Sequence, residues 1–420
     1  MRRTILLAPI LFLSFHAIAQ STVSILLKPD RVFDGEQVFT NYWVLVDSGK
    51  ITAVGAAGSF AVPKNCSTIV LKGQTLLPGL IEGHSHIFLH PYNETKWEDQ
   101  VLKESRAERN ARAVNHLRAT LKAGFTTTRD LGTEGLMYDD VGMKIALMKG
   151  IIPGPDLITS TRAIVATGSY APVSPSPDVT LPQGAAEADG VAGLVHEART
   201  QIGKGADFIK VYADVPWAPG KRASPSFTEA ELKALVDAVN SSGRYVAAHA
   251  VTAEGMRRAV EAGVKTLEHG DQGTREVFEL MKAKGVGYCA TLAAAEAYAE
   301  YAGWVKGRDP EPASVTEKKV SFKLAVDIGV KICMGGDVGV YAHGDNAREM
   351  ELMVEYGMKP LDVLKATTSV NADVFGIDQK AGRIRTGLPA DILVVEGDPS
   401  VNIKQIRNVR LVLKNGTAVK

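Results

Sequence analysis

The sequence is poor in cysteine and has no excess of charge of one sign. Its 420 residues include three cysteines, Cys66, Cys289 and Cys333, and its formal net charge is +1 at pH 7. A chain of this length folds without disulfide bonds, so Cys289 and Cys333, which lie in apolar runs, are expected to be buried free thiols; a bridge between them is the alternative. The balanced charge gives no electrostatic footprint for nucleic acid or an acidic membrane surface. We therefore expect a small-molecule partner.

The first residues have the composition of an export signal. Arg2 and Arg3 form a basic start, residues 5–15 are mostly apolar, and Ala17-Ile18-Ala19 has the small-x-small pattern of a cleavage site. The apolar run is shorter than the roughly 20 residues that a membrane-spanning helix needs. We predict a signal peptide over residues 1–19, a mature chain that begins at Gln20 and is periplasmic or secreted, and no membrane association after cleavage.

Short β-like runs lie at both ends of the chain. Residues 43–46, 51–54 and 68–71 are such runs, separated by turn signals, and residues 391–395 and 409–413 repeat the pattern. We predict that residues 20–77 and 382–420 pair into one small β-sandwich domain formed by both termini.

The central region, residues 78–381, alternates strand-like and helix-like segments. The clearest helix runs from Thr228 to Ser242, where Thr228 and Glu231 form a capping box and apolar residues recur on one face. No glycine-rich phosphate loop follows an early strand, which weakens the alternative of a doubly wound open sheet. The pattern predicts an α/β fold with a (β/α)8 TIM barrel. The expected strands end near His86, Arg129, Thr161, Tyr212, His249, His269, Thr291 and Asp337.

Two segments of this region are expected to shape the pocket. The stretch with Pro172, Pro175, Pro177 and Pro182 predicts a long loop after the third strand that serves as a lid or pocket wall. We expect substrate selectivity to lie mainly in residues 167–190 and in the insertion 292–318.

Several strand ends carry side chains of the kinds that bind metals. His84 and His86 are two residues apart, so on a strand they point the same way. His249 and His269 each end an apolar strand, and Asp337 follows another. Singly, each fits a hydrogen-bonded core histidine or a solvated turn aspartate. Together they place imidazole and carboxylate groups at the carboxyl ends of parallel strands, which indicates a site for zinc or another first-row divalent ion.

Lys210 lies near a strand end, in chain order between the two histidine pairs. A charged ammonium group would repel a metal, so a solvent-facing lysine is the simpler interpretation. A lysine with a lowered pKa is instead neutral, and it can take up CO₂ to form a carbamate that bridges two ions. We state the carbamate as a hypothesis that rests on the position of Lys210.

These motifs together resemble the metal-dependent amidohydrolase superfamily, in its imidazolonepropionase-like branch. That branch includes Xaa-Pro dipeptidases, carboxypeptidases that release basic residues, and ochratoxin-hydrolysing amidases. The resemblance covers nearly the whole chain after the signal segment. The matching stretches are 78–86, 126–130, 208–210, 248–249, 268–270, 336–337 and 382–391. One departure is Thr167-Gly168-Ser169-Tyr170, where many relatives carry Gly-Gly-His, so the pocket wall there is expected to differ.

The resemblance implies a centre of two zinc ions per chain held by six side chains. One ion would be bound by His84, His86 and Asp337, the second by His249 and His269, and N6-carboxylysine at position 210 would bridge them; the six are His84, His86, Lys210, His249, His269 and Asp337. A bridging hydroxide would attack the amide carbonyl, with Asp337 as general base and then general acid.

The resemblance also favours a dipeptide or an N-acyl amino acid, including ochratoxin-type amides, as the substrate. Tyr212 and His343 would bind that substrate, with purely structural roles as the alternative, while Arg129 and Asp130 are expected to brace each other. Relatives are often multimeric, so a homo-oligomer is expected. A cyclic-amide hydrolase or ring deaminase is the alternative function. A non-catalytic binding barrel is a third interpretation, which the complete ligand set disfavours.

Overall fold

The computed structural model describes residues 24–176, 178–218 and 220–420. The expected signal segment, residues 1–19, and the start of the mature chain at Gln20 lie outside the described residues. Among the helices that are described, none has the length and apolar character needed to cross a membrane.

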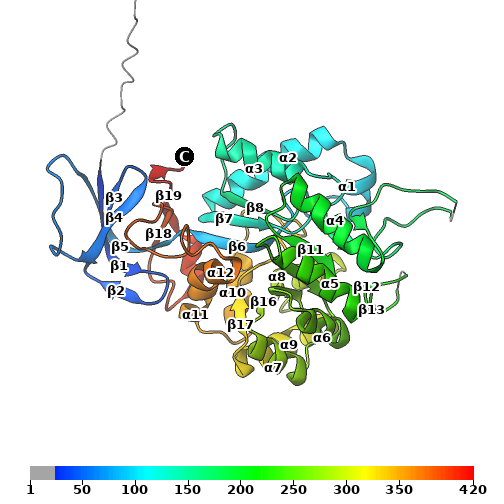
Figure 1. Ribbon diagram of the computed structural model, residues 1–420. Coiled ribbons are helices and arrows are strands. Elements are labelled where there is room, and N and C mark those ends of the chain that lie inside the picture. The colour runs from blue at the N-terminus through cyan, green and yellow to red at the C-terminus, as the bar shows by residue number, and fades with distance from the viewer. Residues whose placement is uncertain (1–23, 177, 219) are drawn as a thin grey trace, which may run out of the picture.

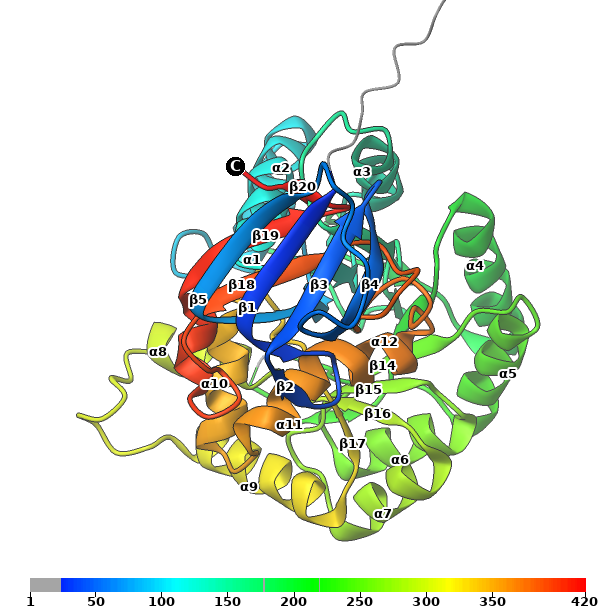
Figure 2. The ribbon, with the colours of Figure 1, turned by 90° about the vertical axis from the view of Figure 1, so that its left-hand side faces the viewer.

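The two ends of the chain form one eight-stranded sheet. Strand β5 (Ser67–Pro78) pairs in parallel with β1 (Ile25–Phe33) and antiparallel with β18 (Ile392–Glu396), so residues more than 300 positions apart lie side by side. The order is β20-β19-β18-β5-β1-β3-β4, with β2 beside β1. The other strands are β2 (Val38–Thr40), β3 (Tyr42–Asp47), β4 (Lys50–Ala56), β19 (Val409–Lys414) and β20 (Thr417–Ala418). Figure 2 shows this sheet, in which the red strands of the C-terminal end continue the row of blue strands of the N-terminal end where β18 meets β5.

The central region contains two parallel sheets. One has the order β6-β7-β8 and the other β10-β9-β11-β14-β15-β16-β17. A parallel bridge between Ser85 and Val338 joins the segment that ends β6 to the segment that follows β17. The strands are β6 (Leu80–Ser85), β7 (Phe125–Asp130), β8 (Asp156–Thr159), β9 (Ile164–Val165), β10 (Ala186–Glu187), β11 (Ile209–Tyr212), β14 (Val246–Ala250), β15 (Thr266–His269), β16 (Gly287–Cys289) and β17 (Lys331–Cys333).

A glycine allows the first and last of these strands to approach closely. The amide of Gly83 in β6 donates to the carbonyl of Met334, just after β17, at 3.1 Å. A Cβ at position 83 would lie 2.4 Å from that oxygen, closer than any side chain tolerates. Any other residue at position 83 would therefore separate β6 from the segment that carries Asp337.

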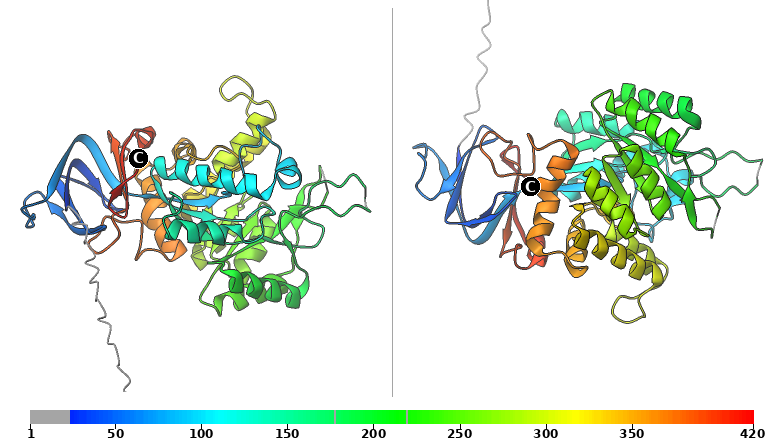
Figure 3. Two further views of the ribbon diagram at one scale, coloured as in Figure 1. Left: turned by 90° about the horizontal axis from the view of Figure 1, so that it is seen from above. Right: turned by 60° about the horizontal axis from the view of Figure 1, so that its bottom comes forward.

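Helices follow the strands and cover them on the outside (Figures 1 and 3). In α5 (Glu229–Asn240) the expected capping box of Thr228 and Glu231 is present, and the face with Leu232 and Val236 is buried. The remaining helices are α1 (Trp97–Lys103), α2 (Arg106–Lys122), α3 (Asp139–Met148), α4 (Gly190–Lys204), α6 (Ala253–Ala262), α7 (Arg275–Lys284), α8 (Leu292–Tyr301), α9 (Ala313–Ile328), α10 (Ala347–Glu355), α11 (Pro360–Lys365) and α12 (Asn371–Phe375), with a π-helical turn (Ala366–Val370) and a 3₁₀ helix (Ile403–Arg407).

The core explains the cysteine pattern. The parallel strands are buried on both faces, as expected for strands covered by helices, and β11 is buried at every position. Cys289 and Cys333 are partners on β16 and β17 and are buried free thiols, as the sequence predicts. Cys66 is also free. Apolar burial, rather than disulfide bonding, therefore stabilises this core.

Candidate metal centre and substrate cavity

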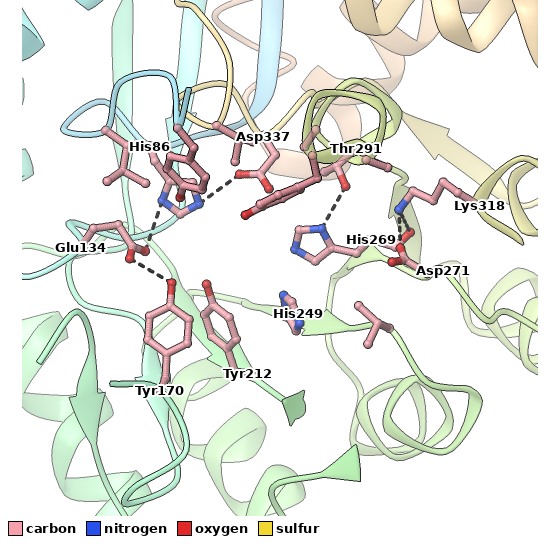
Figure 4. Close-up of a pocket in the computed structure, with 17 residues that line it drawn as sticks. His86, Glu134, Tyr170, Tyr212, His249, His269, Asp271, Thr291, Lys318 and Asp337 are labelled. Carbon is pink, nitrogen blue, oxygen red and sulfur yellow. Dashed lines mark hydrogen bonds and ion pairs between the residues drawn. The ribbon is translucent and has the colours of Figure 1, made fainter. Parts of the chain in front are cut away.

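The strand topology brings the predicted ligands to one end of the parallel sheets. His84 lies in β6, Lys210 in β11, His249 in β14 and His269 ends β15, while Asp337 follows β17 by four residues. Parallel strands present their carboxyl ends on the same side, so these residues meet although they are far apart in sequence. In Figure 4 the imidazoles of His86, His249 and His269 and the carboxylate of Asp337 face one shared space.

Interatomic distances show how closely these groups lie. Asp337 Oδ1 lies 3.3 Å from His86 Nε2 and 3.5 Å from His84 Nε2. One ligand atom from each of His84, His269 and Asp337 lies within 4.8 Å of the other two. The ring centroids of His249 and His269 are 4.3 Å apart. Such spacings allow these groups to share a bound cation.

Two of these residues have a strained backbone. His269 has φ of 75° and Asp337 has φ of 61°, both in the left-handed region that residues with a side chain seldom adopt. Each conformation turns the side chain at the end of its strand towards the cavity. Strain of this kind costs about 1–3 kcal/mol per residue and is concentrated at functional sites.

Burial keeps most of the imidazoles uncharged. It lowers the pKa of His84 to about 4, against the opposing charge of Asp337. Burial, together with the charge of Lys210, also holds the pKa of His249 well below its usual range. His269 is shifted the same way, by burial and by the neighbouring His249. His86 differs, because although burial lowers its pKa, Asp337 and Glu134 raise it to about 9. Neutral imidazoles are the form that binds metals.

The side chain of Lys210 is fully buried. Burial lowers its pKa to about 8, although the charges of Glu268 and Asp337 oppose the shift. Its charge also lowers the pKa values of His84 and His249, so the ammonium group acts on one histidine of each predicted ligand pair. The solvent-facing alternative for this lysine is therefore wrong, because its side chain has no access to water.

The unpartnered atoms of the site fit a bound metal. Lys210 Nζ and His249 Nδ1 are buried and have no hydrogen-bond partner among the described residues. An unmade hydrogen bond at a buried polar group costs about 1–3 kcal/mol, so such groups call for a ligand. Imidazole nitrogens with a carboxylate are a donor set that first-row divalent ions prefer. The residues present therefore fit the metal that the sequence predicts.

A buried ion pair supports one of the histidines from behind. Glu268 accepts from His84 Nδ1 at 2.9 Å and from Arg129 Nη2 at 2.8 Å. The expectation that Arg129 and Asp130 brace each other is wrong. Adjacent strand residues point to opposite faces, so Arg129 turns inward to Glu268 while Asp130 accepts from the amide of Ile87.

Buried Glu82 links strand β6 to the segment before Asp337 through hydrogen bonds. Its Oε1 accepts from the amide of His84 at 3.0 Å and from the amide of Gly336 at 2.9 Å. Asn346 donates to its other oxygen. This carboxyl holds β6 against the turn before Asp337, and burial raises its pKa to about 7 against those hydrogen bonds.

A cavity of about 260 Å³ opens onto the centre. Tyr212 lines one wall, and its ring stacks on that of His249 at 4.4 Å between centroids. Beside it, Tyr170 donates to Glu134 at 3.0 Å. Lys318 lines the opposite wall, as Figure 4 shows.

His343 is not among the described residues that line this cavity. Its Nε2 donates to the carbonyl of Leu89 at 3.1 Å, and its ring stacks on His116 at 4.3 Å. These contacts fit the purely structural role that the sequence left open as the alternative for His343.

Sequence reasoning missed several cavity residues. Glu134 lies in a segment that the sequence did not single out. Lys318 is the last residue of the insertion 292–318, which was expected to shape selectivity, but the sequence did not distinguish this lysine from its neighbours. Tyr170 was detectable, because the departure at residues 167–170 marks this wall of the pocket. The structure puts Tyr170 in the cavity lining, so this segment does form part of the pocket wall.

Comparisons with known proteins agree with this geometry. The sequence matches the description "Amidohydrolase family" over residues 75–419. It is 30% identical over 363 residues to an ochratoxinase of Aspergillus niger, covering 80% of this chain and 73% of that protein. The structure is similar to a Xaa-Pro dipeptidase with bound methionine in the active site (TM-score 0.82, 29% identity, 94% of this chain and 99% of the other).

The structure is also similar to a second solved structure. A prolidase complexed with N-methylphosphonate-L-proline has a TM-score of 0.81 and 27% identity, covering 95% of this chain and all of the other (100%). These likenesses imply a TIM-barrel-type α/β fold for this chain. The expected fold class is confirmed at that level.

Proposed function

Because the chain belongs to the amidohydrolase family, we propose that it cleaves the amide bond of a dipeptide or N-acyl amino acid with a pair of zinc ions. The chain is a hydrolase that acts on amide bonds. The proposal adds the metal number, the metal identity and the substrate class. The observation that carries it is that one ligand atom each of His84, His269 and Asp337 lies within 4.8 Å of the other two, while Lys210 Nζ and His249 Nδ1 are buried without a hydrogen-bond partner among the described residues.

We assign the metal ligands as the sequence predicts. His84, His86 and Asp337 would hold one ion, His249 and His269 the other, and Lys210, carboxylated on Nζ, would bridge them. The lowered pKa of Lys210, about 8, supports the carbamate, because only the neutral amine attacks CO₂. Conversion of this buried ammonium into a carbamate would also replace a repelling charge with an anionic ligand.

In this proposal Asp337 transfers the proton, and the metal ions activate the water. When bound, two divalent ions supply Lewis acidity and bring a water molecule to deprotonation near neutral pH. Asp337 is ionised at that pH, because, although burial raises its pKa, His84 and His86 hold it well below the usual range. Its carboxylate accepts the proton of the attacking water and passes it to the leaving nitrogen.

Tyr212 is placed to orient the substrate. Its side chain lines the cavity, and burial, with the charge of Glu134, holds its pKa well above the usual range, so the hydroxyl keeps its proton. It would donate to the substrate's carbonyl oxygen or carboxylate. Similar proteins support an amide with a free amino-acid end: one contains methionine and another an L-proline phosphonate.

The test is hydrolysis by purified protein after zinc is restored. We expect release of a free amino acid from members of a broad panel of dipeptides and N-acyl amino acids, and about two metal ions per chain. The panel includes lactams, hydantoins and imidazolones, because the same donor set supports ring opening. Cleavage of only the cyclic amides would replace this proposal with the ring-opening function, and absence of metal would favour a binding protein.

We further infer how the chain is organised. The Ser85–Val338 bridge supports closure of the parallel strands into one (β/α)8 barrel over residues 78–381. Pairing of β5 with β18 supports a composite domain of residues 20–77 and 382–420. Removal of residues 1–19 on export is proposed from the sequence, and N-terminal sequencing of the exported protein tests it.

A further inference from the structure

A second cavity lies at the opposite end of the parallel strands from the metal centre. Its volume is about 350 Å³. Thr127 in the first half of β7 lines it, as do Asp156, the first residue of β8, and Tyr245, which directly precedes β14. The metal ligands stand at the carboxyl ends of strands in the same two sheets. A molecule in this cavity would therefore not compete with a substrate for space.

Two helical segments and one strand of the eight-stranded sheet complete the walls. Leu147 and Met148 come from the end of α3, and Ile377 follows α12. Figure 1 shows α12 beside the eight-stranded sheet. From that sheet Lys414 reaches the rim, where its Nζ lies 2.9 Å from the carboxylate of Asp156. The cavity thus lies where the parallel strands meet the sheet formed by the two ends of the chain.

The cavity is largely apolar and opens to water beside exposed apolar side chains. Leu157, Ile158 and Phe375 line its interior. Met148 also lines it and is 77% exposed, and Ile145, one turn earlier on the same helix, is 45% exposed. Exposed apolar surface that adjoins an apolar hollow marks a binding site rather than a solvated face.

The charged residues of the lining leave one positive charge unpaired. Lys144 pairs with Asp207 at 2.5 Å, and Asp156 pairs with Lys414. Lys380 is exposed and has no ion-pair partner among the described residues. Both carboxylates of the lining are therefore already neutralised, and the remaining charge favours an anion.

We propose that this cavity binds a medium-chain carboxylic acid in its ionised form, with the chain in the hollow and the carboxylate at Lys380. At about 30 Å³ for a water-sized group, the volume holds roughly ten such groups. Burial of each methylene adds to the affinity, and the flexible side chain of Met148 can adapt to the chain.

Aromatic rings connect this cavity to the residue behind the metal centre. Phe375 lines the cavity, and Arg129 Cζ lies 4.1 Å from the centroid of its ring. Tyr245 also lines the cavity and stacks on Phe208 at 5.2 Å, and the ring of Phe208 is 5.2 Å from Arg129 Cζ. A molecule packed against Phe375 and Tyr245 therefore bears on the position of Arg129.

We expect the bound acid to slow the release of metal. Arg129 donates to Glu268 at 2.8 Å, and Glu268 accepts from His84 at 2.9 Å. A ligand that binds best to the arrangement in which these bonds are made shifts the population towards it. This consequence rests on the proposed zinc centre, whereas the binding of the acid does not.

The first test is calorimetric titration of the full chain with decanoate. We expect saturable binding with a Kd below about 1 mM. Lys380→Gln should weaken it by about two- to fivefold, as should replacement of decanoate by decanamide, because each removes one charge of an exposed pair. Met148→Glu places a negative charge in the lining and should weaken binding by about tenfold or more.

The matched control variants are Lys359→Gln and Val320→Glu. Lys359 is exposed and Val320 is 63% exposed, and neither lines the cavity, so decanoate should bind both variants as it binds the native protein. Absence of saturable binding would overturn the proposal. Binding that Lys380→Gln and Met148→Glu leave unchanged would place decanoate elsewhere and overturn it too. Equal affinity for decanamide would overturn the choice of an anion.

The second test is the rate at which zinc-loaded protein loses zinc to pyridine-2,6-dicarboxylate. Saturating decanoate should slow this loss by about fivefold or more in the native protein and have no effect in Met148→Glu. An unchanged rate in native protein that binds decanoate would overturn the connection to the metal centre. If the protein holds no zinc, the proposed metal centre fails, and the titration alone decides whether the cavity binds the acid.

Discussion

Glu268 and His84 share a buried hydrogen bond of 2.9 Å between Oε2 and Nδ1, and neither side chain is exposed by more than 1%. Because an ionised carboxylate only accepts, the proton lies on Nδ1 of the imidazole. Nε2 is then left unprotonated, facing Asp337 at 3.5 Å. Glu268 therefore sets the tautomer in which His84 can bind a metal, and Arg129 neutralises the buried carboxylate from the other side.

Replacing Glu268 with Gln should weaken metal binding and destabilise the fold. The amide cannot neutralise Arg129, and loss of one partner of a buried ion pair costs about 3–5 kcal/mol. Loss of a group that orients a metal ligand costs about 10- to 100-fold in metal affinity. Metal content after dialysis and thermal unfolding of the metal-free protein measure the two effects separately.

The control for this variant is Glu261→Gln. Glu261 forms a surface ion pair with Lys284, and both side chains are more than one third exposed. Exposed pairs contribute about 0–1 kcal/mol, so this variant should keep its metal and its stability. Equal effects in the two variants would contradict the role given to Glu268.

Asp337→Asn should abolish turnover more completely than it weakens metal binding. The carboxamide keeps an oxygen donor but cannot accept the proton of the attacking water. Loss of general base catalysis lowers kcat by about 10²- to 10⁴-fold. Steady-state kinetics on protein whose metal content has been verified tests this, and a near-normal kcat would refute the catalytic role.

Carboxylation of Lys210 should make metal reconstitution depend on pH and bicarbonate. With a pKa of about 8, the amine is roughly 1% neutral at pH 6 and about half neutral at pH 8, whereas an ordinary lysine stays below about 1% at both. Uptake of zinc by metal-free protein should therefore accelerate as pH rises from 6 to 8, and further when bicarbonate is added.

The matched variant for that experiment is Lys210→Met, which removes the amine and keeps an apolar stem. It should show no bicarbonate effect and bind less zinc. Mass spectrometry of the native protein under gentle conditions should detect one added CO₂. Zinc uptake that is independent of bicarbonate in the native protein would contradict the carbamate.

Tyr212 and His343 were both expected from the sequence to bind substrate. Their substitution should have different effects on kcat/KM. Tyr212→Phe removes a hydroxyl that faces the cavity, so kcat/KM should fall by about ten- to hundredfold. His343→Gln affects a residue bonded to the Leu89 carbonyl, so kcat/KM should stay within about twofold while stability falls by about 1 kcal/mol. A larger loss of kcat/KM in His343→Gln would show that His343 does take part in substrate binding.

Local patterns in the sequence predicted much of the fold. The short β-like runs identified strands β3, β4, β5, β18 and β19 of the end sheet, and the capping box at Thr228 located the start of α5 to the residue. Both patterns depend on neighbours within one turn or one strand. The mistaken pairing of Arg129 with Asp130 came from treating adjacent residues as partners, when the strand turns them apart.

The supporting residues of the site were beyond such patterns. Glu134 reaches His86 and Tyr170 from a turn in which its own φ is 48°, and Lys318 reaches the cavity from the middle of α9. Nothing in the residues around them distinguishes these side chains from surface ones. Their roles arise from contacts across 36 to 49 positions of sequence.

By itself the sequence determined the chemistry of the donors and the order in which strands deliver them, because strand alternation and parallel topology follow from short-range geometry. Only the tertiary structure decided which groups are buried together. The pKa of Lys210 falls because other segments exclude water from it, and the cavity beside Tyr212 exists because side chains from several strands and loops meet there. Burial and loop placement depend on the whole chain, since both are set by packing between elements that share no local pattern.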